Sequence, residues 1–357
     1  MLPFPGSELD FEPSRAEYLS RVKEMIDDDS IPAEILGVSR WNINEIIAER
    51  YSDGNMHVTH TTYYPQLNQA NKTSFCLGDA VHRHPPFNGL GSNTCIQDAF
   101  NLAWKIAYVL KGHANPSLLD SYSAERQPVG HSVITRANQG LRDHLPVWEA
   151  LGMMEPSLPV RMQAFNELSQ VSPAAAARRA KLQKAVEGTA REYHGLGIEM
   201  NQRYESKAVY VADEEAPRPP LPEDPVLFHE ITTYPGSRLP HAWLNTRVPG
   251  KHFSTIDVAG HGVFCLLTGI GGKIWKKAAA GVMEKLGVEV RCCSIGWQQD
   301  FEDPYFDWAR RREVEEDGCV LVRPDRFVAW RSKRMVSNCD EKLLMVMRCF
   351  GPVVTVG

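Results

Sequence analysis

Residues 76–111 read CLGDAVHRHPPFNGLGSNTCIQDAFNLAWKIAYVLK, and this stretch predicts a strand, a glycine-rich loop and a helix. The short apolar run ends at Gly78-Asp79, and prolines and glycines shape the loop that follows. Ser92 and Asn93 suit the N-cap of the helix, and Gly112 suits the position just after its end. Apolar residues then recur at spacings of three and four, which predicts one buried helical face made of Ile96, Ala99, Phe100, Ala103, Trp104, Ala107 and Leu110.

The amino end of this helix suits an electron-rich ligand. The first turn of a helix presents unpaired N–H groups and the positive end of the helix dipole. Gly89 and Gly91 let the backbone approach a ligand without a Cβ in the way. Asp79, at the end of the strand, could accept a hydrogen bond from a sugar hydroxyl. A plainer interpretation stays open at this point: the two glycines only shape a tight turn, and Asp79 caps a local backbone group.

Three segments carry a resemblance to a known family: GDAVHRHPPFNGLGSN at 78–93, IQDAFNLAWK at 96–105, and LDSY at 119–122 with the Glu125-Arg126 and Pro128 that follow it. Together they resemble the second flavin-binding signature of the class A FAD-dependent aromatic hydroxylases, the group that contains the phenol and chlorophenol monooxygenases. The match is long and position-specific, unlike a lone Gly-x-Gly motif. It runs through nearly all of residues 14–355 except 56–74, and it corresponds to the C-terminal part of the complete enzymes.

The resemblance implies a role for each part of the loop. Asp79 matches the aspartate that bonds the ribityl or ribose part of FAD, and the backbone of residues 91–93 matches the segment that faces the pyrimidine edge of the isoalloxazine. Pro86 matches the proline that lines the reactive face of the flavin, with its carbonyl near the bound substrate, and is the catalytic position expected here. The expected cofactor-binding residues are Gly78, Asp79, Pro86, Gly89, Leu90, Gly91, Ser92 and Asn93.

Three further polar residues lie in or near this loop. His82 and His84 flank Arg83, and a histidine pair suggests a metal site or acid–base chemistry. We interpret both as loop residues behind those that touch the flavin, and His82 matches a position that is commonly His in the family. Arg126 is expected to form a structural ion pair under the flavin loop, while spacing alone leaves an exposed surface charge as the alternative.

The composition is that of an ordinary soluble globular protein, with 357 residues, 43% hydrophobic and 23% charged. A net charge of −5 offers no basic surface to nucleic acid. No apolar run approaches the roughly 20 residues that span a bilayer, and the N-terminus lacks a signal-peptide pattern. We therefore expect no membrane partner and a cytoplasmic location. The eight cysteines show no C-x-x-C spacing and no accompanying histidine cluster, which favours buried thiols over a metal site.

Residues 1–54 are expected to be a remnant of the middle, substrate-covering domain of the family. An amphipathic helix is predicted at residues 14–27, where Ser14 and Glu17 form a capping box. Residues 33–38 and 41–51 are predicted to be strands of mixed burial.

Residues 55–74 interrupt the pattern, because in the family the Gly-Asp strand follows almost directly. The segment is polar and aperiodic, and Asp53-Gly54 before it is a hairpin-turn signal. A loop this long is unusual inside a compact unit. We expect an exposed inserted loop at residues 56–74, either a retained intron or a real insertion. A lid over the flavin, with Tyr63 and Tyr64 as its contacts, is the functional alternative.

Residues 75–215 are expected to form the C-terminal part of the FAD-binding domain, and residues 216–225, APRPPLPEDP, a stiff linker. The helices predicted before the linker lie at 117–126, from Pro128 as a helix start, at 133–144 and at 174–190.

A second domain is expected at residues 226–357. Its predicted order is a strand at 263–267, a helix at 273–286, a strand at 288–295, a helix after Pro304 and a closing hairpin at 318–331. With PGSRLPHAWL at 235–244, this order resembles the thioredoxin-like C-terminal domain of the same hydroxylases, without its redox C-x-x-C. The fold class expected is therefore α/β: an incomplete FAD-binding domain of the p-hydroxybenzoate hydroxylase type followed by a thioredoxin-like domain.

Two hypotheses about function stay open. No G-x-G-x-x-G follows an N-terminal strand and no flanked Asp-Gly signature is present, so the chain is expected to hold only a partial FAD site. In the first hypothesis the protein is a truncated or split FAD-dependent monooxygenase that uses NAD(P)H and hydroxylates a small aromatic substrate, as a homodimer or with a complementing N-terminal half. In the second it is a flavin-free relic that acts as a dimerising or binding protein. The sequence does not identify the aromatic substrate.

Overall fold

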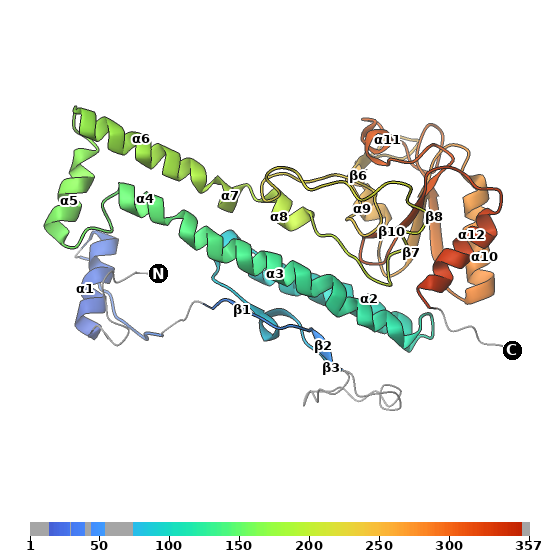
Figure 1. Cartoon of the computed structure of the whole chain (residues 1–357), viewed down its shortest axis with the longest axis horizontal. Helices are drawn as coiled ribbons and strands as arrows, with labels where there is room; N and C mark the ends of the chain where they lie inside the picture. The colour runs from blue at the N-terminus through green and yellow to red at the C-terminus, as the bar shows by residue number, and fades with distance from the viewer. Residues whose placement is uncertain (1–13, 29, 40–43, 54–73, 352–357) are drawn as a thin grey trace. The chain divides into compact units, whose positions relative to one another are not determined.

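The computed structural model describes residues 14–28, 30–39, 44–53 and 74–351 (Figure 1). The chain forms two compact units. The smaller unit is built from Met1–Asn44 and Leu141–Thr189, and the larger unit from Glu45–Gly140 and Ala190–Gly357.

The described part of the smaller unit is helical. Helix α1 (Arg15–Ile26) begins with the predicted capping box: Ser14 Oγ accepts from the Glu17 amide, and the Glu17 carboxylate accepts from the Ser14 amide at 2.7 Å. The strand predicted at residues 33–38 is wrong, because no described strand pairs with this segment and its backbone is irregular. The remaining helices of this unit are α4 (Leu145–Ala150), α5 (Leu158–Glu167) and α6 (Pro173–Gly188).

Two short antiparallel pairs open the larger unit. Strand β1 (Ile46–Ile47) pairs with β4 (His82–Arg83), and β2 (Ser52–Asp53) pairs with β3 (Ser74–Phe75). The strand predicted at 41–51 is therefore confirmed only at β1. Ser74, the last residue of the predicted loop, pairs with Asp53 in β3, and the bounds of the inserted loop stay a prediction. The rest of that loop, together with the lid hypothesis, lies outside the described residues.

Helix α2 (Gly91–Leu110) follows two 3₁₀ turns, η2 (Gly78–Ala80) and η3 (Phe87–Gly89). Its predicted apolar face is confirmed at Trp104, which is buried, but is wrong at Ile96 and Phe100, which are 67% and 45% exposed. The face that is buried is largely polar, because its charged side chains have partners on other elements. The buried residues are Thr94, Asp98, Asn101, Leu102, Trp104, Lys105 and Tyr108.

The ends of α2 were predicted unequally well. The N-cap position is Leu90, without a side-chain cap, so Ser92 and Asn93 lie inside the first turn rather than before it. Gly112 has a φ of +72°, the left-handed conformation expected just after a helix.

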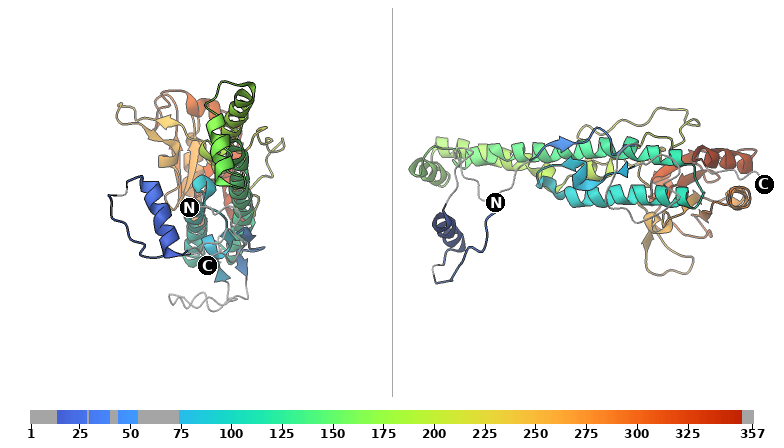
Figure 2. Two further views of the ribbon diagram at one scale, coloured as in Figure 1. Left: turned by 90° about the vertical axis from the view of Figure 1, so that its left-hand side faces the viewer. Right: turned by 90° about the horizontal axis from the view of Figure 1, so that it is seen from below.

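Helix α3 (Asp120–Asp143) follows the turn η4 (Pro116–Leu119) and continues through Pro128. The predicted helix start at Pro128 is therefore wrong. Buried neighbours on both sides of the proline, Arg126 and Val129, hold the helix together by tertiary packing, which outweighs the lost backbone hydrogen bond. Helices α2 and α3 run beside each other (Figures 1 and 2), and an amide–carboxylate bond of 2.8 Å joins Asn101 to Glu125.

A four-stranded mixed sheet forms the C-terminal part, in the order β10-β9-β7-β8. Strands β7 and β8 are parallel neighbours, and β9 is antiparallel to both β7 and β10. This order agrees with the thioredoxin-like arrangement expected from the sequence, and α12 is the one element here that was not predicted. The elements are β7 (Phe264–Thr268), α10 (Lys273–Leu286), β8 (Val290–Ser294), α11 (Asp307–Arg311), β9 (Cys319–Val322), β10 (Val328–Ser332) and α12 (Cys339–Cys349).

Both faces of this sheet are buried. Phe264 and Leu266 pack into a core with α10 and α12, which lie together in Figure 1, while Cys265 and Leu267 point into a second core. Alternate residues of a strand face opposite sides, so β7 is apolar throughout. The second core is covered by the pair β5 (Trp243–Leu244) and β6 (Phe253–Ser254) and by α9 (Thr255–Val258).

Short irregular elements connect the two parts of the larger unit. These are α7 (Ala190–Tyr193), α8 (Leu196–Met200) and the segment 216–225, which contains neither helix nor strand. Residues on both sides of that segment belong to the larger unit, so a domain boundary there stays a prediction. The α/β fold class is confirmed. None of the helices in the described ranges is both long and apolar enough to cross a bilayer.

Gly130 marks a close contact of α3 with the β1–β2 segment. A Cβ added at Gly130 would lie 2.0 Å from Tyr51 Oη, a buried hydroxyl without a hydrogen-bond partner among the described residues. We expect Gly130→Ala to lower the free energy of unfolding by about 1–3 kcal/mol through overpacking. Tyr51→Phe removes the clashing oxygen and should change little alone. Urea unfolding measures the free energy of unfolding, and the double variant Gly130→Ala/Tyr51→Phe should recover most of what Gly130→Ala loses. If the effects of the two single variants simply add, Gly130 and Tyr51 are not in contact.

Candidate flavin site

The loop predicted to hold the flavin is accessible at most of its expected contact positions. Among the expected residues, Asp79, Pro86, Gly89, Ser92 and Asn93 are exposed, Gly91 is partly buried, and Gly78 and Leu90 are buried. These exposed positions are accessible from the surface of the described structure. Their contacts with a flavin stay a prediction.

Positive φ angles shape the loop. Gly78 has a φ of +60° and Gly89 a φ of +61°, and Asn88, directly before Gly89, has a φ of +63°. At Gly78 an added Cβ would also lie 2.8 Å from Cys95 Sγ, so the first turn packs directly on α2. At Gly89 an added Cβ would meet nothing within 4 Å, so glycine is needed there for its conformation rather than for room.

The amino end of α2 presents three backbone donors. Within the described chain, the amides of Gly91, Ser92 and Asn93 donate no hydrogen bond, whereas the Thr94 amide donates to Leu90 O at 2.9 Å. Such N–H groups at the positive end of a 20-residue helix suit an electron-rich ligand edge. These three amides are therefore available to a ligand, and their contact with the pyrimidine edge of a flavin stays a prediction.

The buried side chain of Asp98, in α2, anchors the flavin loop. Asp98 Oδ2 accepts from the Gly78 amide at 3.1 Å and lies 2.8 Å from His82 Nε2, and its Oδ1 accepts from Arg126 Nε at 2.7 Å. Burial would raise the pKa of this carboxyl, but His82 and Arg126 together hold it below its ordinary value. Arg126 is fully buried, so the predicted ion pair under the loop is confirmed and the exposed alternative is wrong.

Arg126 also forms hydrogen bonds with residues of the segment 202–204. Its Nη1 donates to Gln202 Oε1 and to Tyr204 Oη, both at 3.0 Å. Gln202 in turn donates to Gln97 Oε1 at 2.6 Å. One guanidinium thus connects the flavin loop, α2, α3 and the segment after α8.

The two loop histidines have structural contacts. His82 is buried against Asp98, and His84 Nδ1 lies 2.7 Å from the carbonyl oxygen of Pro85. Their rings stack with centroids 6.5 Å apart. Among the residues that the structure describes, no group of three or more His, Cys, Asp or Glu side chains could hold a metal ion. Both histidines support the loop from behind its exposed face.

A second buried charge network joins α2 and α3 to the β9–β10 turn. Arg323 Nη1 donates to Glu125 Oε1 at 2.6 Å and its Nη2 to Glu125 Oε2 at 2.8 Å, while Arg323 Nε donates to Asp325 Oδ1 at 2.9 Å. Lys105 Nζ donates to Glu125 Oε2 at 2.7 Å. Burial lowers the pKa of Lys105 to about 8, against the opposing field of Glu125.

Sequence reasoning missed the polar residues of these networks. Asp98, Asn101 and Lys105 recur at spacings of three and four, which is the spacing of a buried face. That polar periodicity was the available signal, but it does not distinguish a buried network from a solvated face. Arg323 and Asp325 lie in the Arg-Pro-Asp-Arg turn, and no local pattern shows that the turn reaches Glu125.

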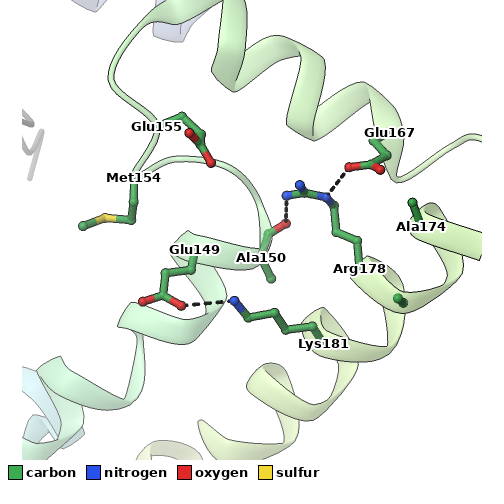
Figure 3. A pocket seen from close by; sticks show the side chains of 9 residues that line it. Glu149, Ala150, Met154, Glu155, Glu167, Ala174, Arg178 and Lys181 are labelled. Carbon is green, nitrogen blue, oxygen red and sulfur yellow. Dashed lines mark hydrogen bonds and ion pairs between the residues drawn. The ribbon is translucent and has the colours of Figure 1, made fainter.

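Each unit contains a hollow on its surface. A hollow of about 550 Å³ in the smaller unit is lined by α4, α5 and α6, and its charges are paired: Arg178 with Glu167 at 2.7 Å and Lys181 with Glu149 at 3.2 Å (Figure 3). None of the expected flavin-binding residues lines it. The other hollow, of about 410 Å³, adjoins the flavin loop at Asn88, whose Nδ2 donates to the carbonyl of Arg191 at 2.9 Å.

Comparison with known proteins places the chain in a family. A model described as FAD binding domain matches residues 7–137, and one described as aromatic-ring hydroxylase, C-terminal, matches residues 232–352. The 2,4-dichlorophenol 6-monooxygenase of Delftia acidovorans is 41% identical over 328 residues. The chain belongs to the FAD-dependent aromatic-ring hydroxylases. The match to this hydroxylase covers 92% of the chain and 52% of the relative.

Other aromatic-ring hydroxylases match in the same way. The phenol 2-monooxygenase of a Pseudomonas strain is 38% identical over 346 residues, which are 96% of this chain and 53% of the relative. The crystal structure of the flavin-dependent monooxygenase PieE in complex with FAD and substrate superposes with a TM-score of 0.82 at 38% identity, over 98% of this chain and 56% of PieE. The chain spans about half the length of the curated hydroxylases it matches.

Proposed function

We propose that this protein acts as an FAD-dependent monooxygenase that hydroxylates a small phenolic substrate, with NAD(P)H as the reductant. The observation that supports this most directly is the exposed loop at residues 78–93, with free amides at the start of α2 and the buried Asp98–Arg126 pair beneath it. Relatives named as phenol and dichlorophenol monooxygenases, 38% and 41% identical to the chain, point to the same substrate class.

Each part of the loop would have a separate task. The exposed Asp79 carboxylate would accept a hydrogen bond from a sugar or ribityl hydroxyl, and the amides of residues 91–93 would donate to the pyrimidine edge. Pro86 would cover the reacting face, and its carbonyl oxygen would accept from the substrate hydroxyl. The bound flavin supplies the redox chemistry, while the protein positions the ring and excludes water. A second copy in a homodimer, or a complementing polypeptide, would add the other cofactor contacts.

The whole proposal is tested by incubating the purified protein with FAD, NADPH and phenol or 2,4-dichlorophenol under oxygen-18 gas. We expect substrate-dependent NADPH oxidation and a product that carries one labelled oxygen atom. A well-folded, colourless protein that leaves NADPH untouched at saturating FAD would instead support a flavin-free binding protein.

Asp79→Ala is expected to weaken FAD binding at least tenfold. A hydrogen bond to a charged acceptor contributes about 1.5–3 kcal/mol, which corresponds to roughly a tenfold to hundredfold change in the dissociation constant. Fluorescence titration with FAD measures this directly. His84→Ala, in the same loop, and Asp120→Ala, an exposed carboxylate outside it, are the matched controls. Equal losses in all three variants would remove Asp79 from the site.

A further inference from the structure

We propose that the larger unit contains a second binding site, a small pocket for an oxyanion between α2, residues 202–204 and the β9–β10 turn. The pocket has a volume of about 120 Å³. None of its lining residues is an expected flavin contact, and the side chains that matter to the argument are Gln97, Phe100, Gln202, Tyr204, Arg238 and Arg326.

Two arginines in this pocket lack anionic partners. Within the described part of the chain, the guanidinium groups of Arg238 and Arg326 form no ion pair and no hydrogen bond, and Arg326 Nε is buried without an acceptor. A buried polar group without a partner is unfavourable, and more so when it is charged. An anion that accepted from both guanidinium groups would satisfy them.

The charges around the pocket do not balance. Three buried carboxylates lie here, those of Asp98, Glu125 and Asp325. Five cations adjoin them: Lys105, Arg126 and Arg323 are paired with these carboxylates, and Arg238 and Arg326 are not. Five positive and three negative charges leave two positive charges over. Burial lowers the pKa of the Arg238 guanidinium. Tyr204 and Asp325 act against this shift, and the neighbouring Arg126 and Arg326 charges add to it.

Aromatic rings orient both guanidinium groups. Arg238 Cζ lies 5.7 Å from the centroid of Phe327, and Arg326 Cζ lies 5.9 Å from the centroid of Phe100. Stacking of this kind limits the rotamers of an arginine and leaves its in-plane N–H groups available to a planar or tetrahedral oxyanion. The pocket is therefore built before its ligand arrives.

The backbone of Arg326 adds a separate observation. Its φ is +67°, in the left-handed region that glycine adopts without strain and other residues rarely adopt. Glycine would adopt this turn conformation with less strain than arginine does. Strained residues of this kind occur preferentially at ligand sites.

The size of the pocket limits the ligand. At roughly 30 Å³ for each water molecule in the liquid, about 120 Å³ has room for about four water-sized groups. This suits phosphate, sulfate or a short carboxylate. The Asp325 carboxylate also borders the pocket, but Arg323 Nε donates to its Oδ1 at 2.9 Å and Asn101 Nδ2 donates to its Oδ2 at 3.1 Å, so its charge is already compensated.

Titration calorimetry of the purified protein with sodium phosphate, sulfate and acetate, against chloride at equal ionic strength, tests the site. We expect one oxyanion per chain and a dissociation constant at least tenfold weaker in Arg326→Gly and in Arg238→Gln. Arg326→Gly should leave the anion-free melting temperature unchanged or higher, because glycine relaxes the turn, and Arg326→Lys should retain part of the affinity. Arg310→Gln, on the exposed surface of α11, should bind like wild type.

Two results would overturn the proposal. One is the absence of any oxyanion binding beyond that of chloride. The other is equal binding by Arg326→Gly, Arg238→Gln and the Arg310→Gln control, which would show that the anion is held by general surface charge.

Discussion

Replacement of Arg323 by methionine is expected to lower the free energy of unfolding by about 3–5 kcal/mol, the usual cost of leaving buried charges unpaired. Arg323 is completely buried and donates to both oxygens of Glu125 and to both oxygens of Asp325. Its guanidinium also lies 5.2 Å from the ring centroids of Trp104 and of Tyr204. Removal of this one cation leaves two carboxylates in the core, whose remaining hydrogen-bond donors within the described ranges are Lys105, Ser206 and Asn101.

Urea unfolding followed by circular dichroism measures this loss. The control is Arg310→Gln, which breaks an exposed pair with Asp307 and should change the free energy by less than about 1 kcal/mol. Addition of Asp325→Asn to Arg323→Met should recover part of the stability, because one uncompensated carboxylate is then gone while Glu125 keeps its pair with Lys105. A loss for Arg323→Met no larger than for Arg310→Gln would contradict the importance of the network.

Asp98→Ala is expected to have the second large effect, about 3–5 kcal/mol of unfolding free energy together with weaker FAD binding. The variant leaves Arg126 buried without a carboxylate and releases the Gly78 amide and His82, which anchor the first turn of the flavin loop. FAD titration and urea unfolding of the same variant measure the two effects. Normal FAD affinity in a destabilised protein would show that the anchor supports the fold but not the loop.

The pH dependence of this variant provides an independent check. The pKa of Asp98 is lower in the folded protein than the ordinary value of 3.8, so its stabilising contribution is complete above that value and is lost as the pH falls through the folded pKa. The difference in melting temperature between wild type and Asp98→Ala should therefore be largest near about pH 7 and shrink below about pH 4. A difference that grows in acid would contradict the sign of this shift.

Local sequence patterns predicted those parts of the fold whose stabilising contacts are near in sequence. The helix at residues 273–286 was predicted with the bounds it has, because glycines end it and an apolar stripe faces the sheet. The capping box at Ser14 and the left-handed Gly112 also depend on neighbouring residues alone. The Gly269 to Lys273 segment is a strand-to-helix turn between β7 and α10, in keeping with its spacing.

The buried face of α2 could not be predicted in this way. Apolar periodicity favoured Ile96 and Phe100, while the true interior contains Asp98, Asn101 and Lys105. Burial of those polar groups is favourable only because Arg126, Glu125 and Asp325 form hydrogen bonds with them. Asp325 is 224 residues from Asn101 in sequence, and a single sequence contains no signal for that contact.

The candidate site was predicted through the family resemblance more than through periodicity. Asp79 and Pro86 are exposed and the amides at the start of α2 have no acceptor among the described residues, and the roles that the resemblance implied for them stay a prediction. The anchoring function of Asp98 was not anticipated, although the residue stands in one of the matched segments. A helical aspartate is usually solvated, so its burial becomes evident only when Arg126 is seen against it.

A crystal structure of the protein grown with FAD tests the central claim most directly. The account predicts the isoalloxazine ring beside Pro86, with its pyrimidine edge within hydrogen-bonding distance of the amides of residues 91–93 and a cofactor hydroxyl on Asp79. Electron density for the ring at any other place, or a fully liganded crystal in which these amides face only water, would contradict it.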